Sequence, residues 1–245
     1  MTRSAAPTDI ATGIAGVRAR IAAAAARVGR AASAVHLIGI SKTVPADRVQ
    51  EAVDAGLTDL GENRIQEASG KIPEIHPGDD ELTWHLVGRL QKNKVRRALE
   101  LFTWIHSVDS APLAERIDRI AGEMGLTPTV LLEVNLAGEA TKSGIPHTRL
   151  GELLEMSEEL RNVHVAGLMA VPPAPPAGSG PEASRPWFKQ LAGLRDTWSR
   201  RGYDLPVLSM GMTGDFDIAV EEGATHVRVG RAIFGKRPPA RKVAG

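Results

Sequence analysis

A lysine stands at the junction of a predicted strand and a predicted helix, in the segment HLIGISKTVPADR (residues 36–48). Val35–Ile40 is an apolar run of strand length, and helical spacing of apolar residues begins after Pro45. Lys42 at this junction either extends its ammonium group to water or presents a reactive amine at the mouth of a site. The segment alone favours the first alternative, so the remaining motifs have to decide between the two.

Two later segments have the composition of a phosphate-binding site. Ser209 and Thr213 lie in SMGMTGD, around the end of the run Val207–Met210, and Gly230 follows the run His226–Val229. Backbone N–H groups at helix starts bind phosphate, because unpaired donors and the helix dipole both point at the anion. The alternative is a pair of tight turns that need glycine for positive φ angles. The pattern by itself leaves both open.

Eight short apolar or β-branched runs alternate with helical patterns along the 245 residues. The runs are Val35–Ser41, Asp59–Gly61, Trp84–Gly88, Trp104–Val108, Val130–Asn135, Val163–Val171, Val207–Met210 and His226–Val229. The helical patterns are Pro45–Ala55, Arg64–Lys71, Asn93–Glu100, Ala111–Met124, Leu150–Leu160, Trp187–Arg200 and Asp215–Glu222, with one more in the alanine-rich segment Ile14–Ala26. The alternation predicts an α/β fold, a single (β/α)8 TIM barrel with an extra N-terminal helix. An open doubly wound sheet is the competitor, but its glycine-rich fingerprint after the first strand is missing.

Closing the barrel brings chemical groups together, because the carboxyl ends of all strands meet at one mouth. Lys42 ends the first strand, Asn63 follows the second and His85 belongs to the third. The eighth strand lies beside the first, so Arg228 comes near Lys42. A lysine, an arginine and a phosphate cradle at one mouth would suit a phosphorylated aldehyde, which the lysine would hold as an imine. Asn63 could instead be a helix cap, and His85 a core histidine.

The motifs resemble those of the YggS/PROSC family, the pyridoxal 5′-phosphate (PLP) homeostasis proteins, from about Val35 to Phe234. The motifs that occur in the family's order are SKT at Lys42, GENRIQE, WHLVGRLQKNK, KSGI, GLMAVP, SMGMTGDFDIAV and VRVGRAIFG. The resemblance implies a barrel similar to the N-terminal domain of bacterial alanine racemase, with PLP held on Lys42 as a Schiff base.

The resemblance also assigns roles to the other candidates. It places Arg228 near the pyridine nitrogen of PLP, and Thr213, Gly230 and Arg231 at the phosphate. Thr213 departs from the serine that the family usually has, but it keeps the hydroxyl. The expected cofactor-binding set is Lys42, Asn63, His85, Ser209, Thr213, Arg228, Gly230 and Arg231. We expect no metal ligand and no catalytic residue.

The expected function is that of a non-catalytic PLP carrier or buffer. An arginine at the ring nitrogen would weaken the ring as an electron sink. Alanine racemases pair their lysine with a tyrosine from a second domain, whereas the one tyrosine here, Tyr203, precedes the seventh strand. A weak PLP-dependent amino-acid racemase with Lys42 as its base is the first alternative. A barrel that binds a phosphorylated ligand other than PLP, with Lys42 holding an anion, is the second.

Composition and charge argue against several other classes of protein. The formal net charge of +1 and 4% aromatic content do not favour nucleic acid, and the basic cluster Arg89–Arg97 has the pattern of a solvated helix face. The sequence has no cysteine, which excludes disulfides and thiolate metal sites. No apolar stretch reaches the length of a membrane span. We expect one PLP-binding domain (helix 1–34, barrel 35–236, tail 237–245), a cytoplasmic monomer whose partners beyond PLP are apo forms of PLP-dependent enzymes.

Overall fold

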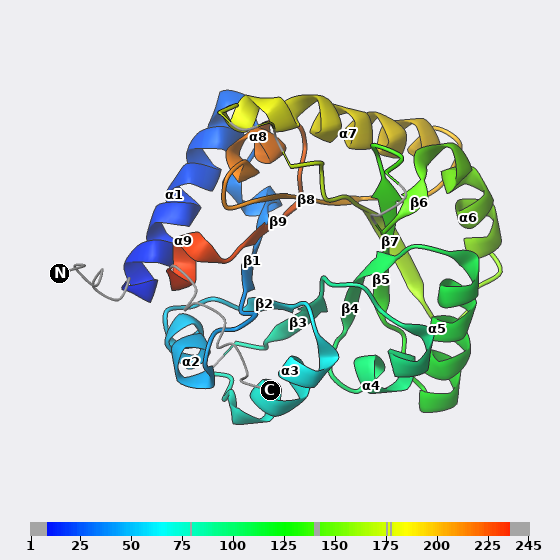
Figure 1. The fold of residues 1–245 in the computed structure, drawn as a ribbon, viewed down its shortest axis with the longest axis horizontal. Coiled ribbons are helices and arrows are strands. Elements are labelled where there is room, and N and C mark those ends of the chain that lie inside the picture. Colours follow the sequence, from blue (N-terminus) through cyan, green and yellow to red (C-terminus); the bar gives the residue numbers. More distant parts are fainter. Residues whose placement is uncertain (1–8, 79, 140–142, 175, 177, 236–245) are drawn as a thin grey trace, which may run out of the picture.

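The computed structural model describes residues 9–78, 80–139, 143–174, 176 and 178–235. The expected tail, residues 237–245, and Lys142 of the KSGI motif lie outside these residues. Parallel strands in the described residues close into a barrel surrounded by helices (Figure 1). The predicted (β/α)8 fold is confirmed.

Eight strands form the barrel, and each predicted run contributes one. They are β1 (His36–Ile40), β2 (Asp59–Glu62), β3 (Thr83–Leu86), β4 (Trp104–Val108), β5 (Thr129–Asn135), β7 (His164–Met169), β8 (Val207–Met212) and β9 (His226–Val229). Neighbours in this order are paired, and β9 pairs with β1 with Arg228 opposite Ile38. A two-residue strand, β6 (Ile145–Pro146), extends the sheet beside the end of β5. The sequence analysis missed it, because two residues carry no periodicity.

The helices lie outside the strands. They are α1 (Ile10–Arg27), α2 (Ala46–Asp54), α3 (Ile65–Lys71), α4 (Val95–Leu99), α5 (Ala111–Met124), α6 (Leu150–Ser157), α7 (Arg185–Ser199), α8 (Phe216–Glu221) and α9 (Arg231–Phe234), with 3₁₀ turns at Ala32–Ala34, Ile72–Glu74, Lys92–Lys94, His147–Arg149 and Pro181–Ser184. The boundaries of α5 match the prediction because its end is well marked, with Gly125 in the left-handed conformation at φ 65°. The predicted helix Asn93–Glu100 is shorter, since residues 92–94 form a 3₁₀ turn.

The N-terminal helix α1 completes the outer layer. Up to residue 235, where the description ends, only the short α9 follows β9, and α1 packs against α2, α8 and α9, between α2 and α8 in Figure 1. Its buried residues recur at helical spacing on one face: Ile10, Ile14, Val17, Ile21, Ala24 and Ala25. The alanine-rich segment therefore takes the place of the helix that would follow the eighth strand, rather than covering one end of the barrel.

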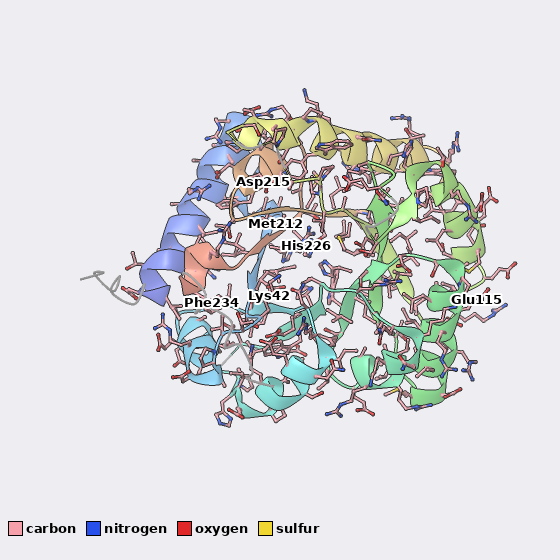
Figure 2. The ribbon with its side chains drawn as sticks, in the orientation of Figure 1. Lys42, Glu115, Met212, Asp215, His226 and Phe234 are labelled. Atoms are coloured by element: carbon pink, nitrogen blue, oxygen red, sulfur yellow. The ribbon has the colours of Figure 1, made fainter. Side chains whose placement is uncertain are left out.

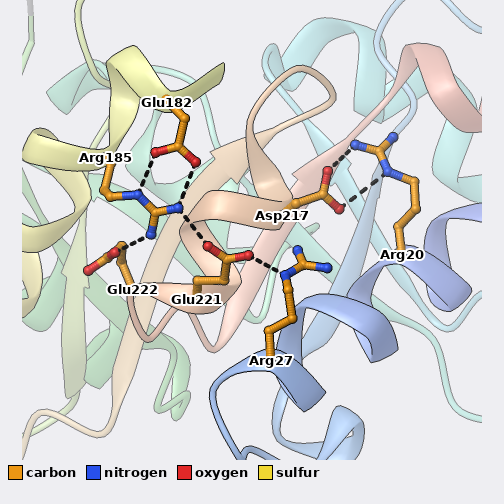
Figure 3. A network of polar contacts seen from close by, with 7 residues as sticks. All are labelled: Arg20, Arg27, Glu182, Arg185, Asp217, Glu221 and Glu222. Carbon is orange, nitrogen blue, oxygen red and sulfur yellow. Dashed lines mark hydrogen bonds and ion pairs between the residues drawn. The ribbon is translucent and has the colours of Figure 1, made fainter. Parts of the chain in front are cut away.

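Arginines connect α1 to the helices beside it (Figure 3). Arg27 Nε contacts Glu221 Oε1 at 2.6 Å, and Arg185 Nη2 contacts the other oxygen of the same carboxylate at 2.6 Å. The remaining pairs of this network are Arg20 with Asp217 and Arg185 with Glu182 and Glu222. Each exposed ion pair contributes little to the stability of the folded state. The main effect of the network is therefore to orient α1 and α8 on the barrel.

The inside of the barrel is divided between apolar and polar side chains. Leu131, Ala166, Met169 and Val207 form a small apolar cluster, with Trp104 packed against it. Other buried side chains from the strands are polar: His85, His106, Ser209, His226 and Arg228, with the half-buried Asp59 beside His85. Branched apolar residues usually fill such interiors. Burying a polar group costs free energy unless it is hydrogen-bonded. The large number of polar groups inside this barrel therefore points to a functional role.

Candidate functional site

Lys42 lies at the carboxyl end of β1, half-buried inside the ring of helices (Figure 2). Glu115, by contrast, lies on the outside of the molecule on α5 (Figure 2). The residue after the lysine, Thr43, has φ 63° and is the one non-glycine residue with positive φ among those described. This conformation is unfavourable for a β-branched residue and persists only where surrounding contacts hold it.

A buried ionic group holds the peptide chain beside Lys42. Lys71 Nζ on α3 donates to Ser41 O at 2.7 Å and to Glu62 Oε1 at 2.5 Å. Ser41 Oγ also donates to Glu62 Oε1, at 2.7 Å, and Glu67 accepts from the N–H of Thr43. These contacts fix the residues on both sides of Lys42, which limits the directions its side chain can take.

Glu62 and Lys71 lie on the helix side of the sheet. A Cβ added to Gly61 would lie 2.6 Å from Ile40 Cδ1, so Gly61 faces the interior and the next residue, Glu62, faces outward. Burial raises the pKa of Glu62, and the Lys71 ammonium opposes that shift. The sequence analysis singled out Asn63 in GENRIQE and missed this pair. The signal that could have revealed the pair was an ionisable residue, Glu62, at the end of a strand that was predicted to be buried.

Arg228 is a buried cation with neutral partners. The residue is 5% exposed, and its guanidinium donates to Ser209 O at 2.7 Å, Ser209 Oγ at 2.6 Å and Ala170 O at 2.9 Å. Burial lowers its pKa to about 10, so it remains protonated at neutral pH. Because β9 pairs with β1, this charge lies on the strand beside the one that ends at Lys42.

The turns after β8 and β9 meet at the same mouth. Gly230 N donates to Thr213 Oγ1 at 3.4 Å, a long hydrogen bond. Gly211, at φ 89°, allows the tight turn, since a Cβ there would lie 2.5 Å from Ala219 Cβ. Asp215 accepts from Met212 N and from Ser184 Oγ, both at 2.8 Å, so both of its carboxylate oxygens are engaged by the protein. The hydroxyl of Thr213, and the N–H of Gly230 that is held by this long hydrogen bond, are the donors that these two turns could offer to an anion.

Asn63 and Arg231 lie at the mouth as well. Asn63 follows β2 and is half-buried, and Arg231 is the exposed first residue of α9. Gly88, after β3, packs directly on Asn63, because a Cβ there would lie 2.2 Å from Asn63 O. The absence of a side chain at Gly88 therefore sets the position of the Asn63 backbone.

His85 is fully buried inside the barrel, as is Ser209. Its Nε2 contacts Asp59 Oδ1 at 3.1 Å, at the opposite end of β2 from the mouth, and its Nδ1 contacts His106 Nε2 at 3.0 Å. Both ring nitrogens are therefore used inside the protein. Ser209 lies between this histidine pair and Arg228, since its Oγ contacts His106 Nδ1 at 2.9 Å. The sequence analysis did not single out Asp59 or His106.

A metal site and a membrane-spanning helix are two other features whose requirements the described residues do not meet. No group of three or more histidine, aspartate or glutamate side chains in that part of the chain could hold a metal ion. Within the same residues, no helix has the length and hydropathy to cross a membrane.

Known proteins share both the sequence and the fold. Residues 16–238 match the family model described as alanine racemase, N-terminal domain. A pyridoxal phosphate homeostasis protein of Aquifex aeolicus is 44% identical over 219 residues, which cover 89% of this chain and 94% of the relative. The chain belongs to the pyridoxal phosphate homeostasis protein family. The Escherichia coli (strain K12) member is 39% identical over 238 residues, covering 96% of this chain and 99% of its own length.

Solved structures agree with membership of the pyridoxal phosphate homeostasis protein family. PipY of Synechococcus elongatus PCC7942, solved with PLP bound, has a TM-score of 0.80 at 39% identity, covering 92% of this chain and 100% of PipY. Alanine racemase of Clostridium difficile 630 has a TM-score of 0.69 at 14% identity, and the match covers 95% of this chain but 58% of the racemase. The likeness to the racemase therefore concerns the fold.

Proposed function

We propose that this chain binds PLP at the mouth of its barrel and serves PLP homeostasis as a carrier or buffer of the cofactor, without substantial turnover. It would act in the cytoplasm as a monomer, supply apo forms of PLP-dependent enzymes and so influence amino-acid and keto-acid metabolism indirectly. The observation that carries the proposal is the pairing of β9, which holds Arg228, with β1, which precedes Lys42, together with the Thr213–Gly230 contact between the segments that follow β8 and β9. The PLP bound to PipY supports it.

The donors at the mouth fit the groups of PLP one by one. The amine of Lys42 would attach to the aldehyde, and the Thr213 hydroxyl, the N–H of Gly230 and the Arg231 guanidinium would hold the phosphate. Arg228 would donate to the ring nitrogen, and donation from a protonated arginine leaves that nitrogen unprotonated. When bound, PLP supplies a reactive aldehyde and an aromatic ring that can stabilise carbanions.

Covalent labelling of Lys42 tests the proposal. The purified chain is incubated with PLP, reduced with borohydride and mapped by peptide mass spectrometry. A pyridoxyl group is expected on Lys42, because this residue is half-buried at the end of β1, on the strand next to the one that carries the Arg228 cation. Pyridoxal, which lacks the phosphate, should label far less at equal concentration, since it cannot use the donors of the two turns.

The matched variants are Lys42→Ala and Lys92→Ala, the second being an exposed lysine of a 3₁₀ turn. Lys42→Ala should lose the label while keeping its urea unfolding midpoint, and Lys92→Ala should keep both. Labelling that is confined to other lysines would contradict the assignment of Lys42. Equal labelling by PLP and pyridoxal would contradict the phosphate site.

A further inference from the structure

A line of hydrogen bonds crosses the inside of the barrel below the mouth. Arg228 Nη1 donates to Ser209 Oγ at 2.6 Å, and the same oxygen contacts His106 Nδ1 at 2.9 Å. His106 Nε2 contacts His85 Nδ1 at 3.0 Å, and His85 Nε2 contacts Asp59 Oδ1 at 3.1 Å. We call these five residues the interior network. They come from β9, β8, β4, β3 and β2, so the network joins residues on opposite sides of the barrel.

The two ends of the interior network determine the direction of every bond in it. A guanidinium can only donate and an ionised carboxylate can only accept. Burial pushes the pKa of Asp59 up, but its hydrogen bonds from His85 and Thr58 outweigh burial and the pKa lies below its usual value. Burial lowers the pKa of both His85 and His106, so both rings are neutral at pH 7.

One arrangement of protons then satisfies all four contacts. His85 carries its proton on Nε2 and donates to Asp59, so its Nδ1 accepts. His106 must donate from Nε2 to that nitrogen, and its own Nδ1 then accepts from the Ser209 hydroxyl. The Ser209 oxygen in turn accepts from Arg228. Reversing any one bond would leave two donors or two acceptors facing each other in a buried interior.

The interior network constrains the guanidinium of Arg228. Its bonds to Ser209 O, Ser209 Oγ and Ala170 O use three of its five N–H groups. Ser209 can hold this orientation only while its own hydroxyl proton points to His106. The direction in which Arg228 presents its remaining donors therefore depends on a chain of hydrogen bonds that leads to Asp59, the first residue of β2.

We propose that Asp59, His85 and His106 are positioning residues of the cofactor site. Through Ser209 they hold Arg228 in the one orientation that aims its remaining N–H groups at the ring nitrogen of PLP. This inference rests on the proposed function and gives His85 a role below the cofactor instead of a contact with it.

Two substitutions of His106 separate this role from plain packing. In His106→Asn the side-chain amide lies near the position of Nδ1, so its oxygen can still accept from Ser209. In His106→Gln the amide lies near Nε2, so it can donate to His85 but leaves the Ser209 hydroxyl without its acceptor. The control is His226→Asn, because His226 is a buried interior histidine whose ring lies near those of His85 and His106 but whose Nδ1 contacts Thr225, outside the interior network.

The probes are PLP and its 1-deaza analogue, in which carbon replaces the ring nitrogen. We expect the unsubstituted chain to bind PLP about tenfold more tightly than the analogue, as for one hydrogen bond from a charged donor. His106→Gln should lose most of this preference, while His106→Asn and His226→Asn keep it. General damage to the barrel would weaken both probes equally, and such a result for His106→Gln would overturn the inference.

A second readout needs no cofactor. The imidazole ¹⁵N chemical shifts of the ligand-free chain at pH 7 should show both His85 and His106 neutral and protonated on Nε2. An imidazolium, or a proton on Nδ1 of either ring, would overturn the inference. Failure of the unsubstituted chain to bind PLP would overturn the proposed function and the ring contact with it. Binding of PLP without preference over the analogue would overturn the inference and the Arg228 contact with the ring, while PLP binding itself would stand.

Discussion

At the scale of single residues, the buried histidines impose a pH dependence on folding. His226 is 5% exposed, its ring stacks on that of His36 with centroids 4.6 Å apart, and its Nδ1 contacts Thr225 Oγ1 at 3.0 Å. Burial, with nearby positive charge, lowers its pKa from 6.5 to about 3. The His226 ring therefore stays neutral in the folded state at pH values at which it binds a proton in the unfolded state.

The free energy of unfolding should fall as the pH drops from about 6.5 towards 3, because only the unfolded state binds the His226 proton in that window. One such group contributes a slope of about 1.4 kcal/mol per pH unit. His226→Asn should make the slope shallower by about that amount when urea unfolding is measured at pH 6, 5 and 4. The control His164→Asn replaces an exposed histidine and should keep the full slope. An unchanged slope in His226→Asn would show that its burial does not govern acid unfolding.

At the scale of elements, α1 supports the phosphate end of the proposed site through α9. Gly13 lies where the two helices touch, and a Cβ there would lie 2.8 Å from Ala232 O and 3.0 Å from Ile233 O. Gly16, one turn further along α1, has no atom within 4 Å of its added Cβ. The two glycines differ in their surroundings but share one helix, which makes them a matched pair.

Gly13→Ala should push α1 away from α9, destabilise the chain by about 1–3 kcal/mol and weaken PLP binding, because α9 begins next to Gly230. Gly16→Ala should instead stabilise by about 0.5–1 kcal/mol and leave PLP affinity unchanged, since alanine is the better helix former. Urea unfolding and PLP titration measure the two effects. If both variants gained stability and kept their affinity, the close approach of α1 to α9 would not matter to the site.

At the scale of the whole molecule, Lys42, which is proposed to bind PLP, and Tyr203, the one candidate for a racemase's second base, lie at opposite ends of the barrel. Racemisation requires proton transfer on both faces of the substrate, and therefore two positioned groups. Lys42 lies at the mouth. Tyr203, the one tyrosine of the sequence, precedes β8 at the other end of the barrel. Its ring packs edge-on against that of Trp198, with the two ring centroids 5.7 Å apart.

The PLP-loaded chain should therefore exchange the α-proton of L- or D-alanine into deuterated water no faster than free PLP does. Proton NMR of the alanine signal measures the exchange, and Lys42→Ala gives the background. The same loaded chain should restore activity when it is mixed with a PLP-depleted enzyme. Exchange on the order of 1 s⁻¹ or faster would instead identify a PLP-dependent racemase, because that rate lies in the usual range of enzymes.

The sequence by itself determined the barrel and the candidates at its mouth. Apolar runs alternating with helical patterns have few closed arrangements, and closure requires β9 to lie beside β1, so the pairing of the strand of Arg228 with the strand that precedes Lys42 followed from strand order alone. The glycine-containing turns after β8 and β9 were also readable, because turn chemistry is local.

Only the tertiary structure decided which buried polar groups meet. Periodicity indicates the face on which His85, His106 or Glu62 lies, but not the partner it finds across the barrel or beneath a helix. His106 and Ser209 are 103 residues apart in sequence, and His85 and Asp59 are 26 apart. Such contacts depend on the register of several strands at once, and a shift of one residue would turn each side chain to the opposite face. The placement of His85 below the mouth, and the pairing of Lys71 with Glu62 behind Lys42, therefore required the folded barrel.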